Sequence, residues 1–112
     1  MEIESEVLDN GILLISLDGR MNLKDIQEFE QSLRALVKGH RAVIIDLSGL
    51  DYLYSMGLRS LIKCAQMVQL KCGRLVLMAP SKEVLAVLTA SGASTLMPIC
   101  RNRAEAIAAV HS

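Results

Sequence analysis

Hydrophobic and polar positions change their spacing along the chain, and each spacing predicts one kind of element. Residues 3–8 and 12–17 are short apolar runs, and the Asp-Asn-Gly turn between them predicts a β-hairpin. The continuous apolar runs at 42–47 and 75–78 are typical of strands buried on both faces of a parallel sheet. A shorter apolar run at 97–99 predicts a last strand.

Between these runs, apolar residues recur at helical spacing, which predicts four helices. The helices are expected over residues 23–37, 55 or 56 to 70, 82–91 and 103–111. Asn22, Ser81 and Asn102 precede three of them and have side chains suited to capping. The buried faces are expected to include Leu23 in the first helix and Leu85 in the third.

The resulting order, β-β-α-β-α-β-α-β-α, predicts an α/β fold with an opening hairpin and a mixed, mostly parallel sheet covered by about four helices. The length of 112 residues suits one domain, residues 1–112. Hydrophobic residues make up 52% of the chain and aromatic residues only 3%, so the core must be built mainly from aliphatic side chains and Met.

Charge and composition exclude several classes of function. Twelve basic and twelve acidic residues cancel, so the basic surface of a nucleic-acid-binding protein is not expected. No apolar run approaches the roughly 18 residues of a membrane span, and the acidic N-terminus does not resemble a signal peptide. Three cysteines without paired spacing suit a reduced compartment, so we expect a cytoplasmic protein without membrane insertion.

Residues with catalytic chemistry are present but are not arranged as in known enzymes. His40 and His111 have no partner at ligand spacing, and Cys64 and Cys72 fit core-filling or incidental thiols. No phosphate-binding glycine loop, Gly-x-Ser-x-Gly motif or metal-ligand cluster occurs. We therefore expect no enzyme activity, no cofactor and no metal.

The most informative stretch is DLSGLDYLYSMGLRSL, residues 46–61, where a strand gives way to a helix. One interpretation is that Ser55 caps this helix. The other is that Ser55 accepts a phosphate, because free N–H groups and the helix dipole favour negative charge there. The residues leave both interpretations open, and one hydroxyl can serve both purposes at different times.

Residues 43–50 and 52–58 resemble the signature of STAS domains, which include the bacterial anti-sigma factor antagonists. That family pattern is a buried strand ending in Asp-Leu-Ser, an apolar pair, Asp-Ser-Ser/Thr-Gly-Leu, and a helix. Further likeness covers almost the whole chain and lies at residues 17–22, 73–77, 88–92 and 103–107.

The resemblance implies a function and a site of modification. In such antagonists the serine directly after the motif's Asp is phosphorylated, and by position this is Ser55. The implied kinase is the anti-sigma factor itself. The unphosphorylated antagonist binds it and frees the sigma factor, phosphorylation ends the binding, and a phosphatase resets the cycle.

The chain departs from the family pattern at three positions. Tyr54 takes the place of the motif's Asp, Met56 that of its second small hydroxyl residue, and Asn22 that of an Asp in the early loop. The expected rim is therefore neutral and more apolar. Either kinase recognition is altered or lost, or the chain binds its partner constitutively and Ser55 is only a cap.

A partner-binding surface is expected to combine the loop at 19–22, the segment 52–57 and the exposed face of the following helix, which includes Gln66. Its predicted residues are Asn22, Tyr52, Tyr54, Ser55, Met56, Gly57, Arg59 and Lys63.

The alternative function is a non-phosphorylated STAS-like subunit or scaffold that docks to a transport or signalling complex, a setting in which such domains also occur. The opening hairpin has an edge strand that could pair between copies, so a weak homodimer is a further expectation.

Overall fold

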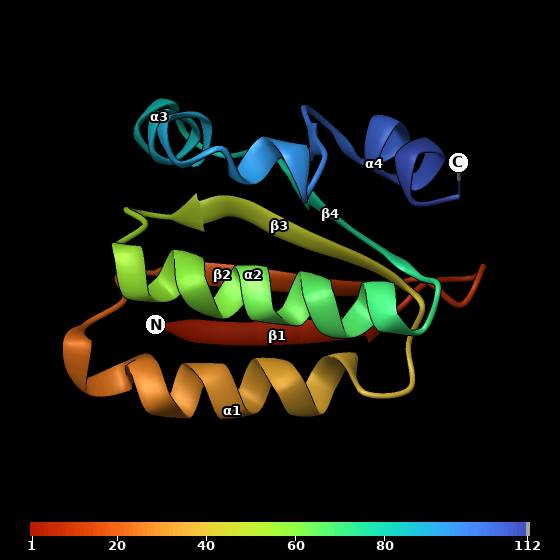
Figure 1. Ribbon diagram of the computed structural model, residues 1–112, viewed down its shortest axis with the longest axis horizontal. Helices are drawn as coiled ribbons and strands as arrows, with labels where there is room; N and C mark the ends of the chain where they lie inside the picture. Colours follow the sequence, from red (N-terminus) through yellow and green to blue (C-terminus); the bar gives the residue numbers. More distant parts are fainter. Residues whose placement is uncertain (112) are drawn as a thin grey trace.

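A five-stranded sheet forms the centre of the computed structural model, which describes residues 1–111 (Figure 1). Its strands, in spatial order, are β1 (Glu2–Val7), β2 (Leu13–Gly19), β3 (Ala42–Leu50), β4 (Arg74–Met78) and β5 (Ile99–Cys100). Strand β1 runs antiparallel to β2, and all later neighbours are parallel. The predicted hairpin and mostly parallel sheet are confirmed.

Helices cover both faces of this sheet. They are α1 (Ile26–Val37), α2 (Ser55–Leu70), α3 (Lys82–Ser91) and α4 (Arg103–Val110), with the short 3-10 turns η1 (Leu23–Asp25) and η2 (Ala93–Thr95). Helices α1 and α2 lie side by side (Figure 1). No helix within residues 1–111 is both long enough and apolar enough to cross a membrane.

Successive side chains of the buried strands point alternately into two hydrophobic clusters, one on each face of the sheet. Val43 and Ile45 point to the cluster that also contains buried residues of α1, α2 and α3. Ile44 points to the opposite cluster, which is closed by Ala106 and Val110 of α4. Strands buried on both faces explain why the sequence shows continuous apolar runs rather than alternation.

Strand β3 is three residues longer than predicted, because it continues to Leu50 instead of ending at residue 47. The pairing of β2 with β3 shifts register between Ser16 and Asp18, where β3 advances one residue more than β2. At this shift the carboxylate of Asp46 accepts a hydrogen bond from the Ser48 N–H at 2.9 Å. The last strand is also displaced, to Ile99–Cys100 rather than 97–99. The longer β3 carries the chain to the edge of the sheet where α2 begins.

Two side chains that we expected in the core lie at the surface. Leu23 is 78% exposed, and Leu85 is also exposed. The chain enters α1 through η1, beyond the end of the helix that packs on the sheet, so helical spacing did not apply to Leu23. The fourth helix ends at Val110, one residue before the predicted end.

Candidate functional site

The start of α2 places Ser55 at the surface. Tyr54 is the N-cap residue, with extended backbone angles (φ −83°, ψ 160°), and its carbonyl accepts a hydrogen bond from the Leu58 N–H at 2.9 Å. Ser55 is therefore the first helical residue rather than the cap, and it is exposed. No hydrogen bond of its hydroxyl occurs within residues 1–111. The interpretation of Ser55 as a cap is wrong.

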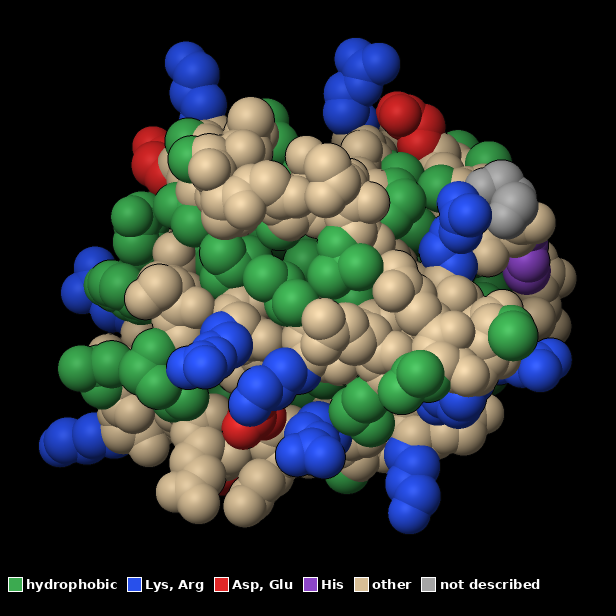
Figure 2. Space-filling view, viewed as in Figure 1, with side chains coloured by type: hydrophobic (Ala, Val, Ile, Leu, Met, Phe, Trp, Pro, Cys, Tyr) green, Lys and Arg blue, Asp and Glu red, His purple; other side chains and the backbone are tan. Residues whose placement is uncertain are grey.

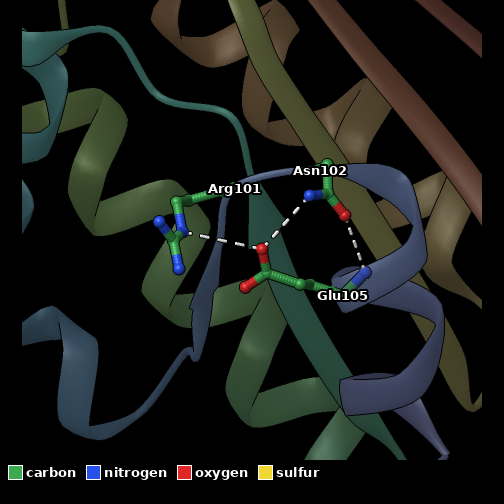
Figure 3. Close-up of polar contacts among 3 residues, drawn as sticks. All are labelled: Arg101, Asn102 and Glu105. Atoms are coloured by element: carbon green, nitrogen blue, oxygen red, sulfur yellow. Dashed lines mark hydrogen bonds and ion pairs between the residues drawn. The ribbon is translucent and has the colours of Figure 1, made fainter.

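Two other helix starts have the caps that the sequence predicts. The Ser81 hydroxyl accepts a hydrogen bond from the Val84 N–H at 3.2 Å. The Asn102 side chain accepts one from the Glu105 N–H at 2.9 Å and donates one to the Glu105 carboxylate at 3.2 Å (Figure 3). Asn22 occupies the N-cap position of η1 without a capping hydrogen bond, so its predicted capping role is not seen.

An open groove of about 610 Å³ lies beside Ser55. It joins the segment after β2 to the residue before Ser55, and its lining comprises Met21, Asn22, Leu23, Lys24 and Tyr54. We call it the 21–54 groove. Asn22 and Tyr54, two of the three departures from the family pattern, line this same groove although 31 other residues separate them in the sequence.

Apolar side chains form an exposed rim around Ser55. Tyr52, Tyr54 and Met56 are 39%, 43% and 45% exposed. The two tyrosine rings meet edge to face with centroids 4.9 Å apart, and Leu53 between them is buried. Hydrophobic side chains reach the surface at this end of the molecule, at the left of Figure 2. An exposed apolar cluster of this kind is typical of a protein-binding surface.

Gly57 lies beneath this rim and is buried. A Cβ atom at this position would lie 2.7 Å from Sδ of Met21 and 3.4 Å from a methyl carbon of Leu53. The absence of a side chain therefore lets the first turn of α2 pack closely against Met21, which lines the 21–54 groove.

The two basic residues predicted on α2 differ in their surroundings. Arg59 is exposed one turn after Ser55. Lys63 forms an ion pair with Glu30 of α1, with Nζ and Oε1 3.1 Å apart. Lys63 therefore joins the two helices. The first turn of α2 contains no acidic residue, so the end of the helix that favours negative charge is unoccupied by a carboxylate of that turn.

Side chains that could act as nucleophiles or metal ligands lie elsewhere. Cys64 is buried in α2, and burial raises the pKa of its thiol to about 11, with Arg34 lowering it and Glu30 raising it. Burial, and secondarily Glu105, raises the pKa of the Cys100 thiol. Cys64 fills the core as predicted, and Cys72 is an exposed thiol. Within residues 1–111, no group of three His, Cys, Asp or Glu side chains is placed to hold a metal.

Leu23 and Lys24 line the groove beside the predicted residues, although the sequence did not point to either of them as a site residue. The spacing of Leu23 from Ile26 fits a helix, and for that reason the sequence predicts Leu23 in the core. Apolar spacing alone holds no signal that separates Leu23 from the core residues of the helix.

Comparison with known proteins identifies the family. The STAS domain profile matches residues 3–106, and the chain belongs to this family. The resemblance seen in the sequence is thus confirmed. BtrV of Bordetella bronchiseptica, named as an anti-sigma factor antagonist, is 34% identical over 110 residues, which cover 97% of this chain and 94% of BtrV.

Solved structures share the fold at lower identity. TM1081 of Thermotoga maritima, also named as an anti-sigma factor antagonist, superposes with a TM-score of 0.88 at 17% identity, covering 98% of this chain and 95% of that one. The anti-sigma factor antagonist SpoIIAA in its unphosphorylated form gives 0.82 at 20% identity, covering 98% and 96%. SpoIIAA of Bacillus in its phosphorylated form superposes with a TM-score of 0.74 at 19% identity, covering 97% of this chain and 99% of that one.

Proposed function

We propose that this chain is an anti-sigma factor antagonist that binds an anti-sigma factor serine kinase and is released when that kinase phosphorylates Ser55. A phosphatase resets the cycle. In this role the chain works in the bacterial cytoplasm, as a binding protein and a kinase substrate rather than as an enzyme. Its likeness to BtrV over nearly its full length supports the partner class.

The observation that carries the proposal is the free, exposed hydroxyl of Ser55 at the first position of α2. Phosphorylation would transfer the γ-phosphoryl group of ATP to Oγ, releasing ADP and the hydroxyl proton. A capping hydroxyl would first have to give up its hydrogen bond, whereas Ser55 has no such bond within residues 1–111. The existence of SpoIIAA in both phosphorylated and unphosphorylated forms supports a switch in this family.

A phosphate on Ser55 would act through charge and desolvation. It would add about −1.5 to −2 charges at pH 7 in the middle of the apolar rim. A partner that buries Tyr54 and Met56 would have to desolvate that charge or leave the surface. The helix terminus itself tolerates negative charge, so the protein would stay folded while binding is lost.

The proposal is tested with purified protein and the anti-sigma factor kinase of the same organism. Ser55→Ala should bind like the wild type and take up no phosphate from ATP, as measured by intact mass. Ser55→Asp should weaken binding about 100-fold, which corresponds to about 2.7 kcal/mol. The matched control is Ser94→Asp, because Ser94 is an exposed serine in η2. Tight binding by Ser55→Asp would contradict the switch.

The alternative, a subunit or scaffold that docks without phosphorylation, is favoured by the neutral, apolar rim. It predicts an unmodified Ser55 in protein isolated under all growth conditions, and co-purification with an ATP-binding transport subunit. Intact-mass analysis of the native protein, with and without phosphatase treatment, distinguishes the two functions directly.

A further inference from the structure

The 21–54 groove combines apolar and basic chemistry. Leu23 and Tyr54 supply its exposed apolar surface, with Leu23 the more exposed of the two, and the buried Met21 also contributes to the lining. Lys24 is the charged residue of the lining, and within residues 1–111 no carboxylate contributes to it. A surface leucine that is 78% exposed beside an open groove is the kind of side chain that a partner buries.

The charged residues close to the lining residues in the sequence favour an acidic partner. Arg20 directly precedes the lining segment, and Arg59 is exposed one helical turn beyond Ser55. The neighbouring carboxylate of Asp25 lines a separate hollow with Phe29 and is not part of the lining of the 21–54 groove. Asp51 is exposed three residues before Tyr54 and is outside the lining. The positive charge of Lys24 is therefore not balanced within the groove.

We infer that the 21–54 groove receives an apolar side chain flanked by a carboxylate, presented by the anti-sigma factor. This inference rests on the proposed function and names the chemistry of its partner. The apolar side chain would pack between Leu23 and Tyr54, and the carboxylate would pair with Lys24.

The position of the groove explains how a phosphate would act on such a partner. Tyr54 lines the groove and Ser55 is the next residue, so a phosphate on Ser55 would lie next to the groove lining. There it would repel the partner's carboxylate and compete with it for Lys24. The neutral Asn22 and Tyr54 keep the groove open to that carboxylate, which an Asp at either position would repel.

The inference is tested by titrating variants against the purified anti-sigma factor kinase of the same organism. Leu23→Ala should raise Kd about tenfold, and the control Leu70→Ala should not, because Leu70 is similarly exposed but lies at the opposite end of α2. Asn22→Asp, which keeps the side-chain shape and adds a negative charge, should raise Kd about fivefold. Asn10→Asp adds the same charge in the hairpin turn and should have no effect.

Lys24→Glu should raise Kd more than tenfold at low salt, and the difference should shrink as salt is added. The exposed Lys38, at the far end of α1, supplies the control Lys38→Glu. All these side chains are exposed, so thermal unfolding of each variant should match that of the wild type.

The outcomes separate the inference from the function on which it rests. If Ser55→Asp weakens binding but Leu23→Ala binds within twofold of the wild type, the inference is overturned and the proposed function stands. Tighter binding by Asn22→Asp would also overturn the inference, because it would show that the partner presents a cation. A wild-type chain that does not bind the anti-sigma factor at all would overturn the proposed function.

Discussion

Helices α2 and α4 both follow a strand at the same edge of the sheet, yet their first turns are built differently. At α4, the Asn102 side chain accepts a hydrogen bond from the Glu105 N–H and donates one to the Glu105 carboxylate (Figure 3). Arg101 Nε lies 3.6 Å from the same carboxylate. At α2, Tyr54 supplies no capping side chain and the Ser55 hydroxyl has no hydrogen bond within residues 1–111.

The capped first turn of α4 stabilises the fold, whereas the uncapped first turn of α2 leaves a hydroxyl available for binding. A capping side chain contributes about 1 kcal/mol to helix stability, and α4 has this contribution. The start of α2 lacks it and instead exposes a hydroxyl among the apolar side chains of Tyr52, Tyr54 and Met56. The packing of α2 against the sheet and α1 makes the helix stable without a cap.

The largest effect on stability is expected in the buried body of α2, at alkaline pH. Since the folded state raises the pKa of Cys64 from 9.0 to about 11, it keeps a proton that the unfolded chain loses. The free energy of unfolding should therefore be unaffected below pH 9 and fall by up to about 2–3 kcal/mol as the pH rises through that interval.

Urea denaturation at pH 8 and pH 10.5 measures this fall. Cys64→Ala should remove most of the pH dependence, whereas Cys72→Ala should retain it because Cys72 is exposed. An unchanged alkaline slope in Cys64→Ala would show that another group is responsible.

The next largest effect is expected where α2 packs against the groove. In Gly57→Ala the new methyl group would collide with Sδ of Met21, at 2.7 Å. Overpacking costs about 1–3 kcal/mol, and the better helix propensity of Ala offsets part of it, so we expect a net loss of about 1–2 kcal/mol. Chemical denaturation measures the loss, and the substitution should cost much less in a Met21→Ala background. Equal losses in the two backgrounds would exclude Met21 as the cause.

The cap of α4 should show a smaller effect. Asn102→Ala removes the hydrogen bond to the Glu105 N–H and should lower the free energy of unfolding by about 1 kcal/mol. Asn102→Asp retains an acceptor oxygen and should recover most of that loss. If Asn102→Ala leaves the free energy of unfolding unchanged, the difference between the two helix starts does not affect stability.

The smallest effect is expected at Ser55 itself. Ser55→Ala removes no hydrogen bond seen within residues 1–111 and should change the free energy of unfolding by less than about 0.5 kcal/mol. Chemical denaturation of Ser55→Ala and Asn102→Ala under the same conditions compares the two losses in free energy of unfolding. A loss of 1 kcal/mol or more would show that Ser55 caps α2 in solution.

Local patterns in the sequence predicted some features of these starts and missed others. The caps Ser81 and Asn102 were predicted because each acts on a backbone N–H three residues away. The capping interpretation of Ser55 was wrong because the extended residue Tyr54 takes the N-cap position, and phosphorylation of Ser55 stays a prediction. The prediction that Leu23 is buried was wrong, because helical spacing does not reveal where the supporting sheet ends.

The sequence by itself determined the elements, their order, the mixed sheet and the family, since these depend on apolar spacing, turn residues and short motifs. Only the tertiary structure decided that Asn22 and Tyr54 share one groove with Leu23, and that Gly57 packs beneath it. The physical reason is that local propensities act over a few residues, whereas a binding surface depends on where separate segments meet at the edge of the sheet.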